Sequence, residues 1–101
     1  MYKDQTKGDS QMIKKSKRKR IVFSVSAPDA TEVFLTGNFN EWVPNARQMK
    51  KSNGGEWKTT MLLEEGEYEY RFVVDGEWRD DPRCTERRAN EYGSENCVIR
   101  L

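Results

Sequence analysis

A chain of 101 residues is long enough for one domain with a modest core, and 35% of its residues are charged. Its apolar runs fall short of the roughly 20 residues of a membrane span, and its N-terminus has no apolar signal-peptide segment, so we expect a cytoplasmic protein. Without histidine, Cys84 and Cys97 cannot complete a four-ligand metal site, so no metal or cofactor is expected, and free thiols are favoured over a disulfide.

The first 20 residues differ from the rest in charge. They hold eight basic and two acidic residues, a local net charge of +6, whereas the remainder carries −5. Apolar side chains are almost absent from them, so we expect residues 1–20 to be a disordered tail or linker before a domain over residues 21–101. Contact with an anionic polymer is the alternative role for this tail.

Alternation of apolar and polar residues predicts the strands of the first half of the domain. The predicted strands cover residues 21–26, 33–36 and, after a glycine-rich turn at residues 52–55, residues 56–63. Trp57 falls within the regular alternation of the last of these, so we expect it in the core.

The strand at residues 33–36 runs into the loop Gly-Asn-Phe-Asn-Glu-Trp at residues 37–42. Pro44 then removes a backbone donor, so a central strand cannot continue there. We expect Phe39 to turn inward as core. Trp42 lies in a segment without apolar periodicity, and we expect it to be displayed at the surface.

The second half of the domain predicts a hairpin and a closing strand. Residues 67–74 alternate, and the Asp75-Gly76 dipeptide favours a two-residue turn in which both residues adopt positive φ. Trp78 follows on the returning strand, a polar stretch covers residues 83–93, and residues 96–101 are again typical of a strand. Six or seven short strands and no convincing helix predict an all-β antiparallel sandwich.

Four segments carry a family resemblance. They are the Gly-Asn-Phe-Asn-Glu-Trp loop, the hairpin Gly-Glu-Tyr-Glu-Tyr-Arg-Phe-Val-Val-Asp-Gly-Glu-Trp, the Asp-Pro after it, and the final Asn-Glu-Tyr-Gly-Ser-Glu-Asn-Cys-Val-Ile. Together they resemble the glycogen-binding domain of AMP-activated protein kinase β subunits, and are similar to carbohydrate-binding module family 48 and the early-set domains of isoamylases and glycogen branching enzymes. The resemblance covers about residues 20–101. It implies an immunoglobulin-like early-set sandwich of about seven strands that binds α-1,4-linked glucans (glycogen, starch, maltooligosaccharides) without cleaving them.

Trp42 and Trp78 match the two tryptophans that stack on glucose rings in this family. Stacking of an indole on a sugar also has a physical reason that is independent of the resemblance. A pyranose has an apolar C–H face, and a rigid indole covers it with little loss of entropy. The implied partners are an α-glucan polysaccharide or oligosaccharide and a glucan-metabolising enzyme or kinase complex.

Four further residues carry polar or shaping roles by the same resemblance. Arg71 stands where the family has a lysine, and its guanidinium still offers donors to sugar hydroxyls. Tyr92 stands where the kinase domain has a leucine that projects into the curve of the glucan, and it would shape the sugar path or extend the aromatic platform. Ser94 and Asn96 match a threonine and a sugar-binding asparagine.

Three other functions are weighed against glucan binding. Glycoside hydrolysis needs two carboxylates in a cleft, and a small sandwich without histidine offers no deep pocket, so no catalytic residues are expected among Asp80, Asp81, Glu86 and Glu91. Nucleic-acid binding is disfavoured because the domain after the tail is acidic. A protein-interaction or scaffold module of the same fold that has lost sugar binding stays open.

Overall fold

The structure is a computed structural model that describes residues 18–101. Most of the predicted tail, residues 1–17, lies outside the described residues. The strands are β2 (Lys19–Ser26), β3 (Val33–Gly37), β4 (Arg47–Gln48), β5 (Lys50–Lys51), β6 (Glu56–Leu63), β7 (Glu67–Val74), β8 (Glu77–Arg79), β9 (Arg87–Ala89) and β10 (Glu95–Arg100), and a 3-10 turn, η1 (Asn53–Gly55), separates β5 from β6.

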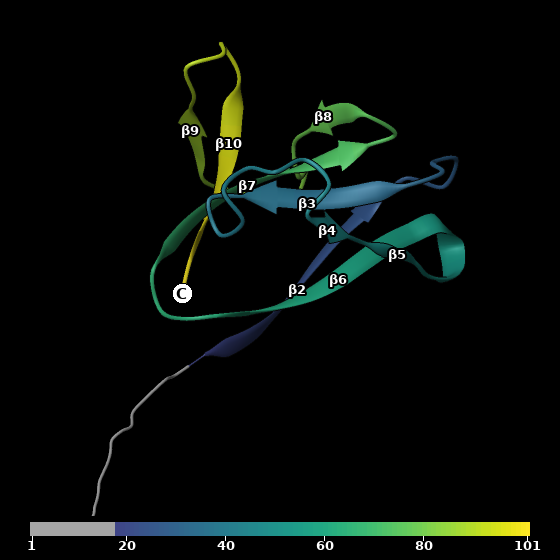
Figure 1. The fold of residues 1–101 in the computed structure, drawn as a ribbon, viewed down its shortest axis with the longest axis horizontal. Helices are drawn as coiled ribbons and strands as arrows, with labels where there is room; N and C mark the ends of the chain where they lie inside the picture. The colour runs from purple at the N-terminus through teal and green to yellow at the C-terminus, as the bar shows by residue number, and fades with distance from the viewer. Residues whose placement is uncertain (1–17) are drawn as a thin grey trace, which may run out of the picture.

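Two antiparallel sheets form the two layers of a sandwich (Figure 1). One has the order β4-β3-β7-β10-β9, with β8 paired to β7 as well, and the other has the order β2-β6-β5. Buried side chains from both sheets meet between the layers, so the prediction of an all-β sandwich is confirmed. The core includes Phe23, Val25, Val33, Leu35, Trp57, Leu63, Tyr70, Phe72, Val74 and Cys97.

The alternation read from the sequence matches the observed burial. Trp57 is only 6% exposed, and its indole N–H donates to the carbonyl oxygen of Ala27 at 2.9 Å. Phe39 packs half-buried against the core, as expected. The Asp75-Gly76 turn has φ values of 49° and 85°, and the Asp75 carboxylate accepts from the backbone N–H groups of residues 31 and 32.

The first strand begins earlier than expected. β2 starts at Lys19, inside the predicted tail, because Lys19 and Arg20 pair with Leu63 and Leu62 at the far end of β6. A long partner strand supplies backbone acceptors and donors for these basic residues, and periodicity alone cannot reveal such pairing.

Gly37 ends β3 for a reason of space rather than of φ. A Cβ at this position would collide with the backbone carbonyl oxygen of Glu69 and would lie 2.8 Å from the ring of Phe39. The neighbouring strand therefore approaches the loop more closely than any side chain allows.

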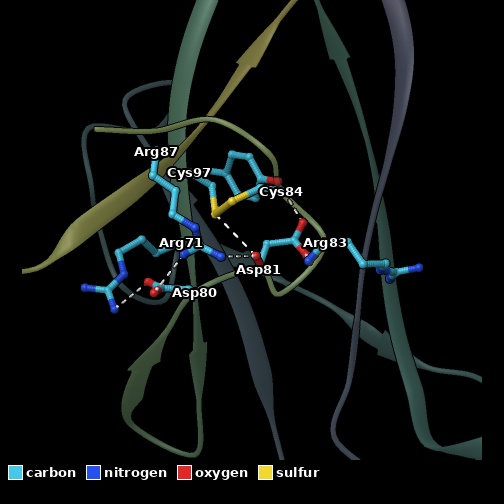
Figure 2. Close-up of a disulfide and its surroundings, with 8 residues drawn as sticks. Arg71, Asp80, Asp81, Arg83, Cys84, Arg87 and Cys97 are labelled. Atoms are coloured by element: carbon cyan, nitrogen blue, oxygen red, sulfur yellow. Dashed lines mark hydrogen bonds and ion pairs between the residues drawn. A yellow bond between two sulfur atoms is a disulfide. The ribbon is translucent and has the colours of Figure 1, made fainter. Parts of the chain in front are cut away.

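Two expectations for the polar stretch at residues 83–93 were wrong. This stretch contains β9, which pairs with β10, and Cys84 forms a disulfide with Cys97 (Figure 2). The segment before β9 runs beside β10, where the Val98 N–H donates to the Glu86 carbonyl oxygen at 2.9 Å, and this contact brings the two cysteines to a Cα separation of 6.0 Å. The hairpin that creates this proximity has only three-residue β9 on one side, which is too short for a periodic signal.

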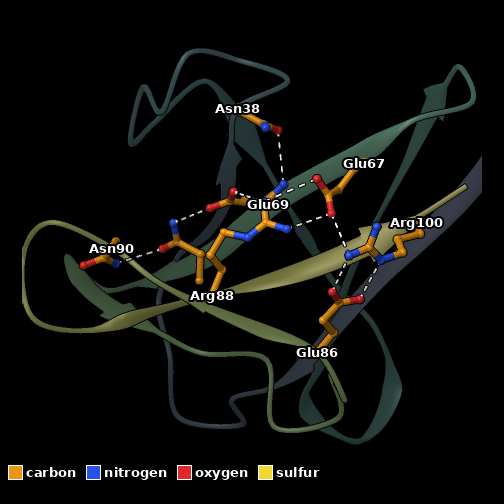
Figure 3. Close-up of polar contacts among 8 residues, drawn as sticks. Asn38, Glu67, Glu69, Glu86, Arg88, Asn90 and Arg100 are labelled. Atoms are coloured by element: carbon orange, nitrogen blue, oxygen red, sulfur yellow. Dashed lines mark hydrogen bonds and ion pairs between the residues drawn. The ribbon is translucent and has the colours of Figure 1, made fainter.

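A network of ion pairs crosses the exposed face of β7, β9 and β10 (Figure 3). Arg88 contacts Glu67 and Glu69 at 2.8 Å each, and Arg100 contacts Glu67 at 2.8 Å and Glu86. A hydrogen bond from Arg88 lowers the pKa of Glu67, and a hydrogen bond from Arg100 lowers the pKa of Glu86. Three adjacent strands are thereby tied together outside the core.

The stability of the domain should fall as this network is protonated. Because the folded-state pKa values of Glu67 and Glu86 lie below the ordinary value of 4.5, their stabilisation is present above that pH and is lost as the pH falls through the folded values. We expect the Tm to drop as the pH falls below the ordinary glutamate pKa of 4.5. Thermal unfolding followed by circular dichroism across the range measures it.

Two charge-neutralising variants test the origin of this acid sensitivity. Combining Glu67→Gln with Glu86→Gln should flatten the dependence of Tm on pH in this acid range. Glu65→Gln, at an exposed position in the β6–β7 turn, should leave the wild-type profile in place. An unchanged profile in the double variant would assign acid sensitivity to other groups.

Candidate functional site

A surface concavity of about 730 Å³ lies on the outer side of the larger sheet. All six residues singled out in the sequence line it, together with two that were not. In Figure 1 the elements that frame it, β8 and the β9–β10 hairpin, project on the side of the β3–β7 layer away from the smaller sheet. The lining residues are Trp42, Arg71, Trp78, Asn90, Glu91, Tyr92, Ser94 and Asn96.

The concavity forms where β7 changes partner along one edge. Its first half pairs with β10 up to Tyr70, and its last half pairs with β8 from Phe72 onward. Arg71 stands between the two pairings and belongs to the polar floor of the concavity. Trp78 is the cross-strand partner of Val73, so the same face of the sheet presents both residues.

Trp42 and Trp78 meet at one end of the concavity. Their ring centroids are 6.4 Å apart, and their planes are inclined by 38°. Trp78 is 42% exposed, whereas Trp42 is half-buried, so it is less displayed than the sequence indicated. The pair forms a bent aromatic surface rather than a flat one.

The loop holds Trp42 in an unusual backbone conformation. Glu41 and Trp42 have φ values of 58° and 60°, in the left-handed region that bulky residues rarely occupy. Asn40 holds the loop in place: its side-chain oxygen accepts from the Gly37 N–H at 3.0 Å, and its amide donates to the Leu35 carbonyl oxygen at 3.2 Å. The Trp42 N–H closes the turn on the Gly37 carbonyl oxygen at 2.9 Å. The indole is thus oriented before any ligand arrives.

Arg71 is held from three sides, by Asp80 (Figure 2), Ser94 and Trp78. Its guanidinium forms an ion pair of 3.0 Å with Asp80, donates to Ser94 Oγ at 3.1 Å, and has its central carbon 6.0 Å from the Trp78 ring centroid. Asp80 also pairs with Arg87 at 3.0 Å. Only 14% of the Arg71 side chain is exposed, and its contacts with Asp80 and Ser94 hold the guanidinium in the lining of the concavity.

The turn between β9 and β10 supplies the opposite wall, and Asn90 organises it. The Asn90 side-chain oxygen accepts from the N–H groups of Tyr92 and Ser94 at 2.9 and 3.2 Å. Its amide donates to Ser94 Oγ at 2.9 Å and to Asn96 Oδ1 at 3.0 Å. Gly93 adopts φ of 83°, which suits a residue without a side chain.

Exposure separates the residues of this wall. Tyr92 is 83% exposed at the tip, whereas Asn96 is only 8% exposed at the base. Glu91 accompanies Tyr92, and a hydrogen bond between their side chains raises the pKa of Tyr92. The wall therefore offers an accessible aromatic ring above a layer of fixed polar groups.

Sequence reasoning missed Asn90 and Glu91 as lining residues. For Asn90, the signal available was an asparagine placed two residues before an aromatic–glycine pair. No signal distinguished Glu91 from the many other exposed acids.

Residues 20–101 match the model of a family described as the glycogen recognition site of AMP-activated protein kinase. The chain belongs to this family. The membership expected from the sequence is therefore confirmed, and the glycogen-recognition family is a family of carbohydrate-binding modules.

Curated relatives of this glycogen-recognition domain come from plants and animals. Protein FLOURY ENDOSPERM 6, chloroplastic, of Oryza sativa subsp. japonica is 43% identical over 62% of this chain and 12% of its own length. Protein PTST homolog 2, chloroplastic, of Arabidopsis thaliana is 37% identical over 73% of the chain and 16% of its length. The human 5'-AMP-activated protein kinase subunit beta-2 is 41% identical over 50% of this chain and 18% of its own length. The chain thus spans less than a fifth of the length of each of these relatives.

Two further observations concern other kinds of site. Among residues 18–101, no group of three or more histidine, cysteine, aspartate or glutamate side chains is placed to hold a metal ion. Within the same part of the glycogen-recognition domain, no helix has the length and apolar character to cross a membrane.

Proposed function

We propose that this domain binds α-1,4-linked glucans without cleaving them, and that the concavity lined by Trp42 and Trp78 is the binding site. The observation that carries the proposal is the bent pair of indoles beside a wall of fixed polar groups. An α-1,4-glucan is a curved chain, so successive glucose rings are inclined to one another. Two inclined indole planes would therefore stack on them better than a flat surface would. Membership of the glycogen-recognition family supports the same ligand.

Each lining residue then has a role. The indoles of Trp42 and Trp78 cover the C–H faces of glucose rings. The accessible edge of Arg71, with Ser94 and Asn96, supplies hydrogen bonds to sugar hydroxyls, and Tyr92 shapes the path of the chain. Binding should be weak to moderate because a shallow site leaves much of the sugar hydrated.

Absence of catalysis is also part of the proposal. A glycosidase needs one carboxyl group with a raised pKa to act as general acid. Asp80 is paired with two arginines, the Tyr70 hydroxyl donates to Asp81 at 2.7 Å, and the pKa of Glu86 is lowered rather than raised. These carboxylates are committed to holding the fold.

The test is a titration of the protein with maltoheptaose and β-cyclodextrin while its tryptophan fluorescence is followed. A saturable change should appear with both ligands and should be insensitive to salt, because stacking on a neutral sugar displaces no counterions. Cellohexaose, a straight β-1,4-glucan, serves as the control and should bind more weakly. Absence of any response to α-glucans would leave the alternative of a scaffold module of the same fold.

Binding of an anionic polymer that weakens steeply with salt would instead support the alternative role of the basic residues that precede the domain.

The partners and the cellular location of the protein are also proposals. The domain would bring a glucan-metabolising enzyme or a kinase complex to the polysaccharide, as the named kinase subunit among its relatives indicates. We predicted a cytoplasmic location; two relatives carry the word chloroplastic in their names, so compartments other than the cytoplasm fit this family as well.

A further inference from the structure

Glu69 of β7 contacts both the loop that carries Trp42 and the β9–β10 hairpin, although it does not line the concavity. Its backbone is bonded to Asn38, which belongs to the loop that carries Trp42. The Asn38 N–H donates to the Glu69 carbonyl oxygen at 3.1 Å, and the Glu69 N–H donates to Asn38 Oδ1 at 3.2 Å. The first loop of the site is therefore tied to this residue.

The side chain of Glu69 reaches the other half of the site (Figure 3). Its Oε1 accepts from Asn96 Nδ2 at 3.0 Å, and its Oε2 accepts from Arg88 at 2.8 Å. A carboxylate is an acceptor only, so it determines that the nitrogen of the Asn96 amide, and not the oxygen, points toward it. The Asn96 oxygen then faces Asn90, which donates to it at 3.0 Å.

This orientation passes along the wall of the concavity. Both hydrogens of the Asn90 amide are used, on Asn96 and on Ser94 Oγ. Ser94 Oγ also accepts from Arg71 at 3.1 Å, so both of its lone pairs are filled and its own hydrogen remains for donation. Ser94 Oγ donates this hydrogen to Asn90 Oδ1, and the two oxygens are 3.2 Å apart. Asn90 Oδ1 already accepts hydrogen bonds from two backbone N–H groups. A sugar oxygen would be a less crowded acceptor.

We propose that Glu69 is a positioning residue for the sugar site. By fixing the Asn96 amide, and through it Asn90, it sets Ser94 as a hydrogen-bond donor toward the ligand and presents the second N–H of Asn96 to the concavity. The site is thereby biased toward sugar oxygens that accept hydrogen bonds. This inference rests on the proposed function of the concavity in glucan binding.

The chain provides a matched control in Glu67. It contacts the same Arg88 at 2.8 Å and lies two residues earlier on β7, but it makes no contact with Asn96 in the described structure. Glu67→Ala and Glu69→Ala each remove one of the two carboxylates on Arg88, and only the second releases the Asn96 amide. A difference between the two variants therefore reports on positioning rather than on loss of an ion pair.

Dissociation constants for maltoheptaose, measured by fluorescence titration of the folded variants, test the proposal. Glu69→Ala should weaken binding about tenfold, the effect of one mispositioned hydrogen bond to a polar partner. Glu69→Gln keeps an acceptor for the Asn96 amide and should restore binding to within about threefold of the wild type. Glu67→Ala should bind as the wild type does. Equal affinities for all four proteins, or equal losses in both alanine variants, would overturn the positioning role while leaving the proposed function in place.

A second readout needs no ligand. In ¹H–¹⁵N spectra of the free protein, the side-chain amide of Asn96 and the backbone amides of Tyr92 and Ser94 should shift in Glu69→Ala and not in Glu67→Ala. Unshifted signals in Glu69→Ala would overturn the inference even if the wild type bound no glucan. If the wild type bound no glucan but these signals shifted in Glu69→Ala, only the proposed function would be overturned. The coupling from Glu69 to the β9–β10 turn would be supported.

Discussion

Replacing Trp78 by alanine should abolish measurable binding of maltoheptaose, with a loss of affinity of about 30-fold or more. A tryptophan that is a main anchor of a binding surface contributes roughly 2 kcal/mol or more on truncation, and each 1.4 kcal/mol is a factor of about ten. Trp42→Ala should have a comparable effect because the two rings form one bent surface, with centroids 6.4 Å apart. Isothermal titration calorimetry, or fluorescence of the remaining tryptophans, gives the dissociation constants.

The control for these variants is Leu62→Ala. Leu62 is also an exposed apolar residue, at 56%, but it lies on β6 in the other sheet. Its loss should leave glucan affinity unchanged, and all three variants should keep the circular dichroism spectrum of the wild type. Retention of wild-type affinity in Trp42→Ala and Trp78→Ala would place the ligand elsewhere on the domain.

Reduction of the Cys84–Cys97 disulfide should produce the largest change in stability. The bond closes a loop with a sequence separation of 13 residues. In the chain-entropy treatment, a loop of about 15 residues corresponds to about 3 kcal/mol of stabilisation through the unfolded state. For a domain of this size, each kcal/mol corresponds to about 4–8 °C, so the Tm should fall by about 12–24 °C in the presence of a reductant.

Reduction is the cleaner experiment because both sulfur atoms stay in place and no cavity forms around fully buried Cys97. A Cys84→Ser variant should already have the lower Tm and should show no further response to reductant. Mass spectrometry after alkylation counts the free thiols in each sample. A wild type whose Tm ignores complete reduction would show that this crosslink contributes nothing to the stability of the fold.

Local patterns in the chain were enough to predict much of the fold. Period-2 alternation predicted the residues of β6 and β7 and their buried faces, because an antiparallel strand covered on one side shows its burial directly in the sequence. The Asp75-Gly76 turn was equally readable, since few residues other than these tolerate positive φ. Elements of two or three residues, such as β4 and β9, carry too little pattern for prediction, although the sequence did predict the strand that bears Trp78.

The sequence likewise predicted one part of the candidate site and missed another. The six residues expected at a sugar site all line one concavity, but their functional role stays a prediction until binding is measured. The resemblance to glycogen-recognition domains named these positions because motifs record residue types in order. It could not show that Asp80 and Ser94 already contact the Arg71 guanidinium.

By itself the sequence determined the fold class, the buried face of each long strand and the family, because these depend on residue order and on local periodicity. Only the tertiary structure decided that Cys84 meets Cys97, that Asn90 organises the β9–β10 turn, and that Glu69 orients Asn96. Each of these contacts joins residues that a register between strands or a closed turn brings together. Such proximity depends on how the whole chain is paired and packed, and no local pattern records it.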